Sequence, residues 1–112
     1  SSGIRLEMSA HSPDAIAQLL KTADALNLQA GTLIVNPVPA EDEIPADEME
    51  TFIHKALIMS HEQGVSGKET TPFLLKQVAE LTAGRSLLTN KALVRNNVKL
   101  GAEVAAAYSS AE

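Results

Sequence analysis

The stretch GTLIVNPVP, residues Gly31–Pro39, decides the fold class of this chain. Its Thr32–Val35 portion is almost wholly apolar, a pattern typical of a short β-strand buried on both faces of a parallel sheet. The strand must end at Asn36–Pro37, because proline has no N–H group to donate to a central ladder. A buried strand of this kind predicts an α/β protein.

Helical signals lie on both sides of this strand. Ser12 and Pro13 form a helix start, with a side-chain oxygen at the N-cap and proline at the first helical position. The pair Thr71–Pro72 repeats that signal later in the chain, and Gly84 closes the helix that follows. Apolar periodicity predicts four helices, over about residues 13–27, 45–64, 72–84 and 86–108, with a loop at 38–44. A second, edge-type strand is expected at Ile4–Met8, where apolar and polar residues alternate.

The predicted element order is therefore β-α-β-α-α-α. Two strands make a poor sheet by themselves, since a two-stranded unit is marginal in water. The buried-type strand at 32–35 thus requires neighbours that the other predicted elements do not supply. We expect residues 1–112 to be a single helix-rich segment of a larger layered α/β/α fold.

Composition excludes several classes of function. The 112 residues are 45% hydrophobic and only 3% aromatic, so the core must be aliphatic. A net charge of −5 and scattered basic residues argue against binding a nucleic acid polymer. No apolar run is long enough to predict a membrane span. The absence of cysteine excludes disulfides and thiolate chemistry, and favours a cytoplasmic location.

Four polar positions are candidates for a ligand site. Asn36 lies at the carboxyl end of the buried-type strand, where open α/β sheets bind ligands, although strand termination by an Asn turn is the simpler interpretation. Lys68 belongs to GKET, which fails the phosphate-binding-loop pattern because Glu62 and Glu69 occupy two of its required positions. Thr71 precedes a helix N-terminus that could face an anion, or is a simple N-cap. Asn90 shares a helical face with Leu93, Val94, Asn97, Gly101, Val104 and Tyr108, a face we expect to be buried.

The asparagines on that face allow two interpretations. A buried amide offers one acceptor and two donors, which suit a pyrimidine edge or a backbone peptide group equally well. We interpret Asn97 as structural. His54 and His61 lie seven residues apart on a helix, but no second zincin histidine follows, so a solvated polar face is the simpler interpretation. No catalytic set and no metal ligands are identified from the residues themselves.

Blocks of sequence in order along the chain resemble the carboxy-terminal third of the pseudouridine-5′-phosphate glycosidases, also called pseudouridylate synthases and related to indigoidine synthase A proteins. The blocks are SSGIRL, TLIVNPVP, GKETTPFLL, VAELTAGRSL and TNKALVRNN. The resemblance covers essentially the whole chain.

The resemblance implies an enzyme, a glycosidase or lyase of nucleoside catabolism. It would reversibly cleave the C-glycosidic bond of pseudouridine 5′-phosphate to give uracil and ribose 5-phosphate. It also implies a Schiff-base lysine, a proton-donor glutamate and a manganese-binding aspartate, all upstream of the motifs present here, and a homotrimer. The isolated chain is then expected to be inactive.

Only Asn90, in TNKALV, matches a substrate-contacting residue of the family. Asn36, Lys68 and Thr71 lie in the strongest matching blocks and are expected near the site. The alternative hypothesis is a non-catalytic, α-rich interaction module that binds a partner through the apolar stripes of its helices.

Overall fold

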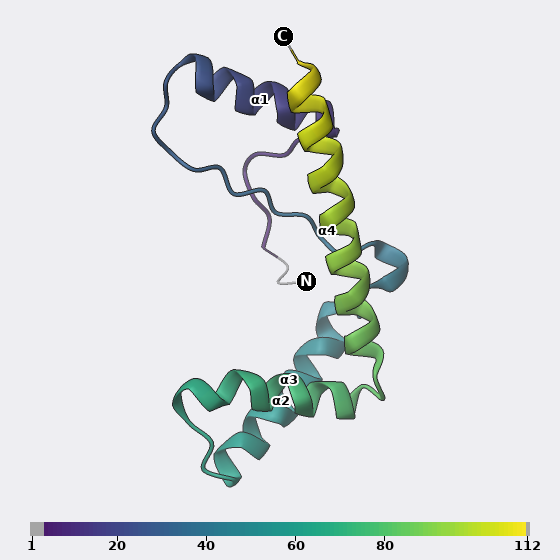
Figure 1. The fold of residues 1–112 in the computed structure, drawn as a ribbon. Coiled ribbons are helices and arrows are strands. Elements are labelled where there is room, and N and C mark those ends of the chain that lie inside the picture. The colour runs from purple at the N-terminus through teal and green to yellow at the C-terminus, as the bar shows by residue number, and fades with distance from the viewer. Residues whose placement is uncertain (1–3, 112) are drawn as a thin grey trace. The chain divides into compact units, whose positions relative to one another are not determined.

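A computed structural model describes residues 4–111 of the chain. This part contains four α-helices and two short 3₁₀ helices (Figure 1). Their bounds are α1 Pro13–Ala25, η1 Ala40–Asp42, α2 Ala46–Glu62, η2 Gly67–Glu69, α3 Thr70–Leu81 and α4 Arg85–Ser110. The predicted helix-rich character is confirmed.

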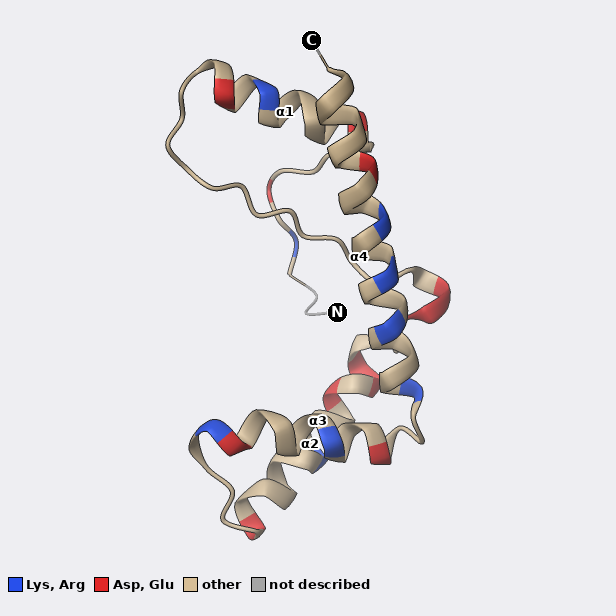
Figure 2. Ribbon diagram, viewed as in Figure 1, with Lys and Arg blue, Asp and Glu red and all other residues tan. Residues whose placement is uncertain are grey.

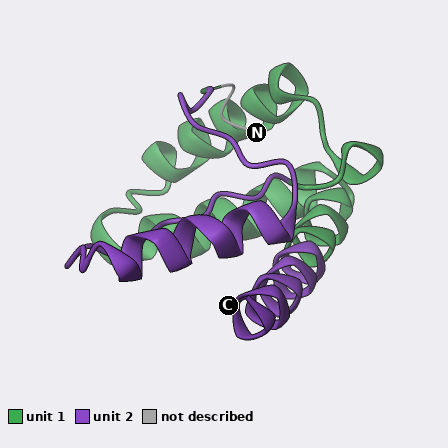
Figure 3. Cartoon of the chain, turned by 90° about the horizontal axis from the view of Figure 1, so that it is seen from above, with its two compact units in different colours: residues 1–4, 38–93 green, residues 5–37, 94–112 purple. Residues whose placement is uncertain are grey.

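The chain divides into two compact units, coloured separately in Figure 3. Unit 1 contains residues 38–93, from η1 to the first turns of α4, together with Ile4. Unit 2 contains residues 5–37, which include α1, and residues 94–111 of the described chain, in the remainder of α4. That residues 1–112 form a single segment of one larger domain stays a prediction.

Unit 1 is built on the pairing of α2 with α3. Ala56 of α2 is completely buried and Ile44, just before α2, is 3% exposed. The chain turns from α3 into α4 through Ala83 and Gly84, whose φ angles of 51° and 84° lie in the left-handed region. Glycine adopts this conformation freely, whereas alanine pays a steric cost there.

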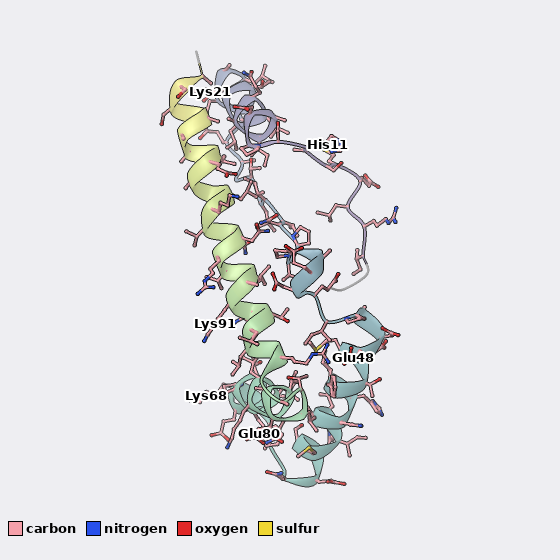
Figure 4. All side chains as sticks on the ribbon, turned by 90° about the vertical axis from the view of Figure 1, so that its right-hand side faces the viewer. His11, Lys21, Glu48, Lys68, Glu80 and Lys91 are labelled. Carbon is pink, nitrogen blue, oxygen red and sulfur yellow. The ribbon has the colours of Figure 1, made fainter. Side chains whose placement is uncertain are left out.

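Three side chains fix the start of α4 within unit 1. The buried Thr82 donates from Oγ1 to the Val78 carbonyl at 2.7 Å and accepts from the Ser86 N–H at 3.1 Å. Arg85 pairs with Glu48 of α2, which Figure 4 labels, with an Nη1–Oε1 distance of 2.5 Å. Thr89 donates to the Asp42 carbonyl at 2.8 Å. These contacts connect α4 to α3, to α2 and to the residues of η1.

Unit 2 has a small apolar interior in which Ala17 and Val104 are buried. The predicted cap of α1 is confirmed, because Ser12 Oγ accepts from the Ala15 N–H at 3.1 Å and Pro13 is the first helical residue. After α1, residues 28–37 form neither helix nor strand. Asn96 of α4 donates to the Pro37 carbonyl at 3.2 Å and holds the end of this segment.

The helix predictions at 13–27, 45–64 and 86–108 are confirmed to within a few residues. The third helix needs a correction, because it begins at Thr70 and Thr71 is therefore not its N-cap. Glu69 holds the N-cap position without a side-chain hydrogen bond. The 3₁₀ helix η2 runs directly into α3, so the backbone is already helical before Pro72.

The two predicted strands are not formed within residues 4–111, where the structure contains no β-strand. A strand exists only as part of a ladder, and residues 5–8 and 32–35 belong to no ladder in this part of the chain. Their apolar side chains are correspondingly open to solvent: Leu33 is 88% exposed and Val35 63% exposed. The β-α-β part of the predicted order is therefore not seen here.

The predicted buried face of α4 is also wrong in part. Val104 is buried and Tyr108 is half-buried, but Asn90, Val94 and Asn97 are exposed. An apolar stripe is buried only where another element covers it, and most of this one is left uncovered by the described residues. None of the helices in residues 4–111 has the length and apolar character needed to cross a bilayer.

Candidate functional site

Asn90, the predicted substrate-contacting residue, lies in the second turn of α4 in unit 1. It is exposed, and its side chain makes no hydrogen bond within residues 4–111. The neighbouring Thr89 fixes this turn through its bond to Asp42. Asn90 therefore presents its carboxamide donors and acceptor to the surroundings from a held helical turn.

Lys68 and Thr71 also belong to unit 1 and are also exposed. Lys68 is the middle residue of η2 (Figure 4), and Thr71 is in the first turn of α3. Their side chains make no hydrogen bond or ion pair in the described chain. No direct contact joins Asn90, Lys68 and Thr71 there, and nothing in the structure tests their predicted closeness to a substrate.

Asn36 is in unit 2, where its side chain meets Asn97. Asn36 Nδ2 donates to Asn97 Oδ1 at 3.1 Å, a contact between residues 61 positions apart in sequence. The Asn97 amide thus ties α4 to the segment that follows α1, and its structural interpretation stays a prediction. This bond does not use Asn36 Oδ1 or Asn97 Nδ2, so the first can accept and the second can donate a further hydrogen bond.

Beside this amide pair lies a cleft of about 640 Å³ within unit 2. Its walls come from α1, from the non-helical segment 34–36 and from one side of α4. The lining is mostly apolar, with the two amides among the polar groups, and includes Leu20, Ile34, Leu100, Gly101, Val104 and Tyr108. A half-open apolar cleft with few polar groups is the usual form of a binding site.

A charged cluster joins α1 to the last turns of α4 in unit 2. The Tyr108 hydroxyl donates to Asp24 Oδ2, and Lys21 Nζ lies 4.2 Å from the centre of the Tyr108 ring. The hydrogen bond to Asp24 and the carboxylate's negative charge both raise the pKa of Tyr108 above its ordinary value of 10.0, because they favour the neutral phenol. No sequence motif predicts this cluster, although Lys21 and Asp24 are three residues apart and so share a side of α1.

The raised pKa of Tyr108 predicts a measurable pH dependence. Because the folded chain holds the phenol proton more tightly than the unfolded chain, the contact stabilises the fold below pH 10 and is lost as the pH rises through the raised pKa. The chain has one Tyr and no Trp, so absorbance near the tyrosinate band reports this group alone. We expect Asp24→Asn to lower the titration midpoint toward 10.0. Asp14→Asn, on the exposed first turn of the same helix, should leave it unchanged; equal midpoints in all three proteins would contradict the assignment.

The histidines of α2 do not form part of a metal site in the described chain. His61 Nδ1 lies 3.1 Å from the Leu57 carbonyl oxygen of its own helix, and His54 is exposed. Residues 4–111 contain no group of three His, Cys, Asp or Glu side chains able to hold a metal ion. The resemblance places the manganese-binding aspartate upstream of the motifs in this chain, so manganese binding by the whole enzyme stays a prediction.

Positive side chains follow one line along α4. Lys91, Arg95 and Lys99 recur at every fourth residue, and all three are exposed. The ribbon of α4 is blue at its basic residues in Figure 2. Lys99 lies 3.9 Å from Glu103, the next acidic residue on the same line. An exposed pair of this kind contributes little to stability. The line is a solvated helix face.

The family model and the similar curated proteins that match this chain agree on one family. The indigoidine synthase A like protein family matches residues 1–107. Three curated relatives, each named pseudouridine-5′-phosphate glycosidase, come from Solibacter usitatus (48% identical over 104 residues), Methylobacterium nodulans (46% over 110) and Deinococcus radiodurans (49% over 108). The matches cover 93%, 98% and 96% of this chain and 35%, 33% and 34% of the relatives. The chain spans about a third of their length, and it belongs to the indigoidine synthase A like family.

Proposed function

We propose that this chain is part of a pseudouridine-5′-phosphate glycosidase, an enzyme that reversibly converts pseudouridine 5′-phosphate to uracil and ribose 5-phosphate. The observation that carries the proposal is the family match over residues 1–107, together with relatives of that name at 46–49% identity. The chain corresponds to the carboxy-terminal third of such an enzyme.

In this proposal the chain contributes substrate contacts and structural support rather than the bond-making groups. Asn90 binds the substrate, with Asn36, Lys68 and Thr71 near the site. The Schiff-base lysine, the proton-donor glutamate and the manganese-binding aspartate belong to the two thirds of the relatives' sequence that has no counterpart here. The complete enzyme is a cytoplasmic homotrimer.

The layered α/β/α fold is the second part of the proposal. Residues 32–35 form a buried parallel strand once neighbouring strands from the rest of the enzyme are present. Support comes from their almost wholly apolar sequence combined with their exposure in this chain. Exposed apolar surface of this kind marks a region that another part of a protein covers.

The experiment that tests the function is an activity assay of a fused protein. The part of the Deinococcus radiodurans relative that lacks a counterpart here would precede this chain in one polypeptide, called the fusion below. We expect the purified fusion to release uracil from pseudouridine 5′-phosphate and to form pseudouridine 5′-phosphate from uracil and ribose 5-phosphate. A folded, manganese-loaded fusion without either reaction would refute the proposal.

Asn90 gives a residue-level prediction in the fusion. Asn90→Ala should lower kcat/KM about 2- to 13-fold, because a hydrogen bond to an uncharged group typically contributes about 0.5–1.5 kcal/mol. The fold should be unaffected, since Asn90 is exposed and has no side-chain hydrogen bond within residues 4–111.

Asn97→Ala is the matched control on the same helix. Asn97 bonds Asn36 in this structure, so its loss should lower the melting temperature more than the activity per folded molecule. If Asn90→Ala keeps full activity and instead lowers the melting temperature, Asn90 is a structural amide and its proposed role is wrong.

A further inference from the structure

Thr89, which precedes Asn90 in α4, makes a hydrogen bond unlike those of the other threonines. Among the threonine hydroxyls that donate a bond within residues 4–111, three bond to the carbonyl four residues earlier in the chain: Thr22, Thr51 and Thr82. A local bond of this kind is common for threonine in helices. Thr89 instead donates to the carbonyl of Asp42, 47 residues away in sequence, at 2.8 Å. Its bond therefore joins α4 to a different element, η1.

The acceptor of this bond is a fixed point of unit 1. Asp42 is the last residue of η1, and its N–H donates to the Pro39 carbonyl at 2.9 Å. Ile44, two residues further along the chain, is only 3% exposed. The chain is thus held both before and after the Asp42 carbonyl. A bond to this carbonyl therefore restrains α4.

Of the contacts at the start of α4, the Thr89 bond restrains the direction of the helix most. The chain enters α4 at Gly84, and Thr82 acts at that entry through its bond to the first turn. The Arg85–Glu48 pair joins two long and partly exposed side chains, which hold a geometry loosely. Thr89 has a short side chain, lies one turn after Arg85 and bonds directly to backbone.

The place of Asn90 depends on this restraint. Its exposed side chain makes no hydrogen bond of its own within residues 4–111. It follows Gly84 by six residues, roughly 9 Å along the helix at about 1.5 Å per residue. A tilt of roughly 6° about the entry would move it by about 1 Å, a displacement large enough to weaken a bond to a substrate.

We propose that Thr89 is a positioning residue of the glycosidase, whose bond to the Asp42 carbonyl sets the place from which Asn90 presents its carboxamide to the substrate. The inference rests on the proposed function and on Asn90 as a substrate contact. Fold stability is a weaker reason for this bond, because Asp42 is exposed and its carbonyl can bond to water when the hydroxyl is absent. Threonine is also a poorer helix former than alanine.

A double-mutant cycle in the fusion tests the proposal, with kcat/KM measured per folded molecule. Thr89→Val keeps the shape of the side chain and removes the hydroxyl. We expect it to lower kcat/KM by at least about twofold, and by no more than Asn90→Ala does, because it acts through Asn90. In the Asn90→Ala fusion the same substitution should change kcat/KM by less than about 1.5-fold. Thr89→Ser, which keeps the hydroxyl, should stay within about 1.5-fold of the unsubstituted fusion.

A purely structural role gives a different result in this cycle. Thr89→Val would then lower kcat/KM by the same factor with Asn90 present and with Asn90→Ala, and that equality would overturn the proposal. So would an unchanged kcat/KM in Thr89→Val. An Asn90→Ala fusion with full activity would overturn it as well, because Thr89 would have no substrate contact to position.

Thr51→Val is the matched control for Thr89→Val. It is the same substitution in the same unit, but the bond that it removes stays within α2. We expect kcat/KM of the Thr51→Val fusion to equal that of the unsubstituted fusion.

Hydrogen exchange supplies a readout that does not need activity. Amide exchange in residues 86–91, the turn of α4 that carries Asn90, would be measured in the 112-residue chain and in the fusion. Thr89→Val should raise these exchange rates at least about threefold, whereas Thr89→Ser and Thr51→Val should not. Unchanged exchange in Thr89→Val would show that the bond restrains nothing, and would overturn the proposal.

The outcomes separate this inference from the proposed function. An active fusion in which Thr89→Val changes nothing overturns the positioning role alone. A folded but inactive fusion refutes the glycosidase function, and the exchange rates in that same protein still decide whether Thr89 holds the turn that carries Asn90.

Discussion

The 112-residue chain alone, assayed beside the fusion, is expected to release no detectable uracil from pseudouridine 5′-phosphate, at least about 10³-fold less than the fusion. Covalent catalysis by a lysine needs an amine held against the substrate carbonyl and activated by its surroundings. Five of the six lysines are exposed, and the half-buried Lys21 lies over the Tyr108 ring. Catalytic groups that act as a unit cannot be replaced by such scattered surface amines.

The assay must exclude the expression host's own enzyme. A host strain lacking its glycosidase, and a mock purification carried through the same columns, supply the control. Turnover by the isolated chain that survives both controls would show that residues 1–112 contain a complete catalytic set, and would assign the chemistry to residues on this chain.

The helices were predictable because their signals are local. The start of α1 follows from Ser12 and Pro13 alone, since the cap bond to Ala15 and the fixed φ of proline act within one turn. The start of α3 was misplaced by about two residues, because a 3₁₀ helix before it supplied helical backbone that the Thr71–Pro72 pattern does not encode.

The strands were not predictable in the same way, because a strand is stabilised by residues distant in sequence. The apolar pattern at 32–35 indicates a segment suited to a buried position in a β-sheet, and residues 4–111 contain no sheet for it to join. The same argument explains the exposed face of α4: the periodicity of Leu93, Val94 and Val104 identifies an apolar stripe but not the element that covers it.

In the candidate site too, sequence blocks pointed to single residues but could not predict contacts between residues distant in sequence. Three candidate residues were chosen because they lie in sequence blocks that match the family: Lys68, Thr71 and Asn90. All three are exposed in unit 1, and their link to substrate stays a prediction. The contact between Asn36 and Asn97 joins residues 61 positions apart, and no spacing rule could have paired them. The cluster of Asp24 with Tyr108 is likewise a product of the fold.

Thr82→Val is expected to destabilise unit 1 by about 1–3 kcal/mol, the usual cost of leaving a buried polar group unsatisfied. Thr82 is 3% exposed and lies where α3 ends and α4 begins. Its hydroxyl donates to the Val78 carbonyl at the end of α3 and accepts from the Ser86 N–H at the start of α4. One oxygen therefore bonds both helix ends. Valine keeps the shape but removes both bonds, and the Ser86 N–H loses its acceptor.

Thr51→Val is the matched control in the same unit. Thr51 is exposed on α2, and its hydroxyl makes one bond, to the Asp47 carbonyl at 3.1 Å. Its loss should change the free energy of unfolding by no more than about 0.5 kcal/mol. Urea titrations followed by helical circular dichroism compare the two, and Thr82→Ser should restore most of the stability. If Thr82→Val and Thr51→Val are equally stable, the α3–α4 turn is held by its backbone and the Arg85–Glu48 pair rather than by Thr82.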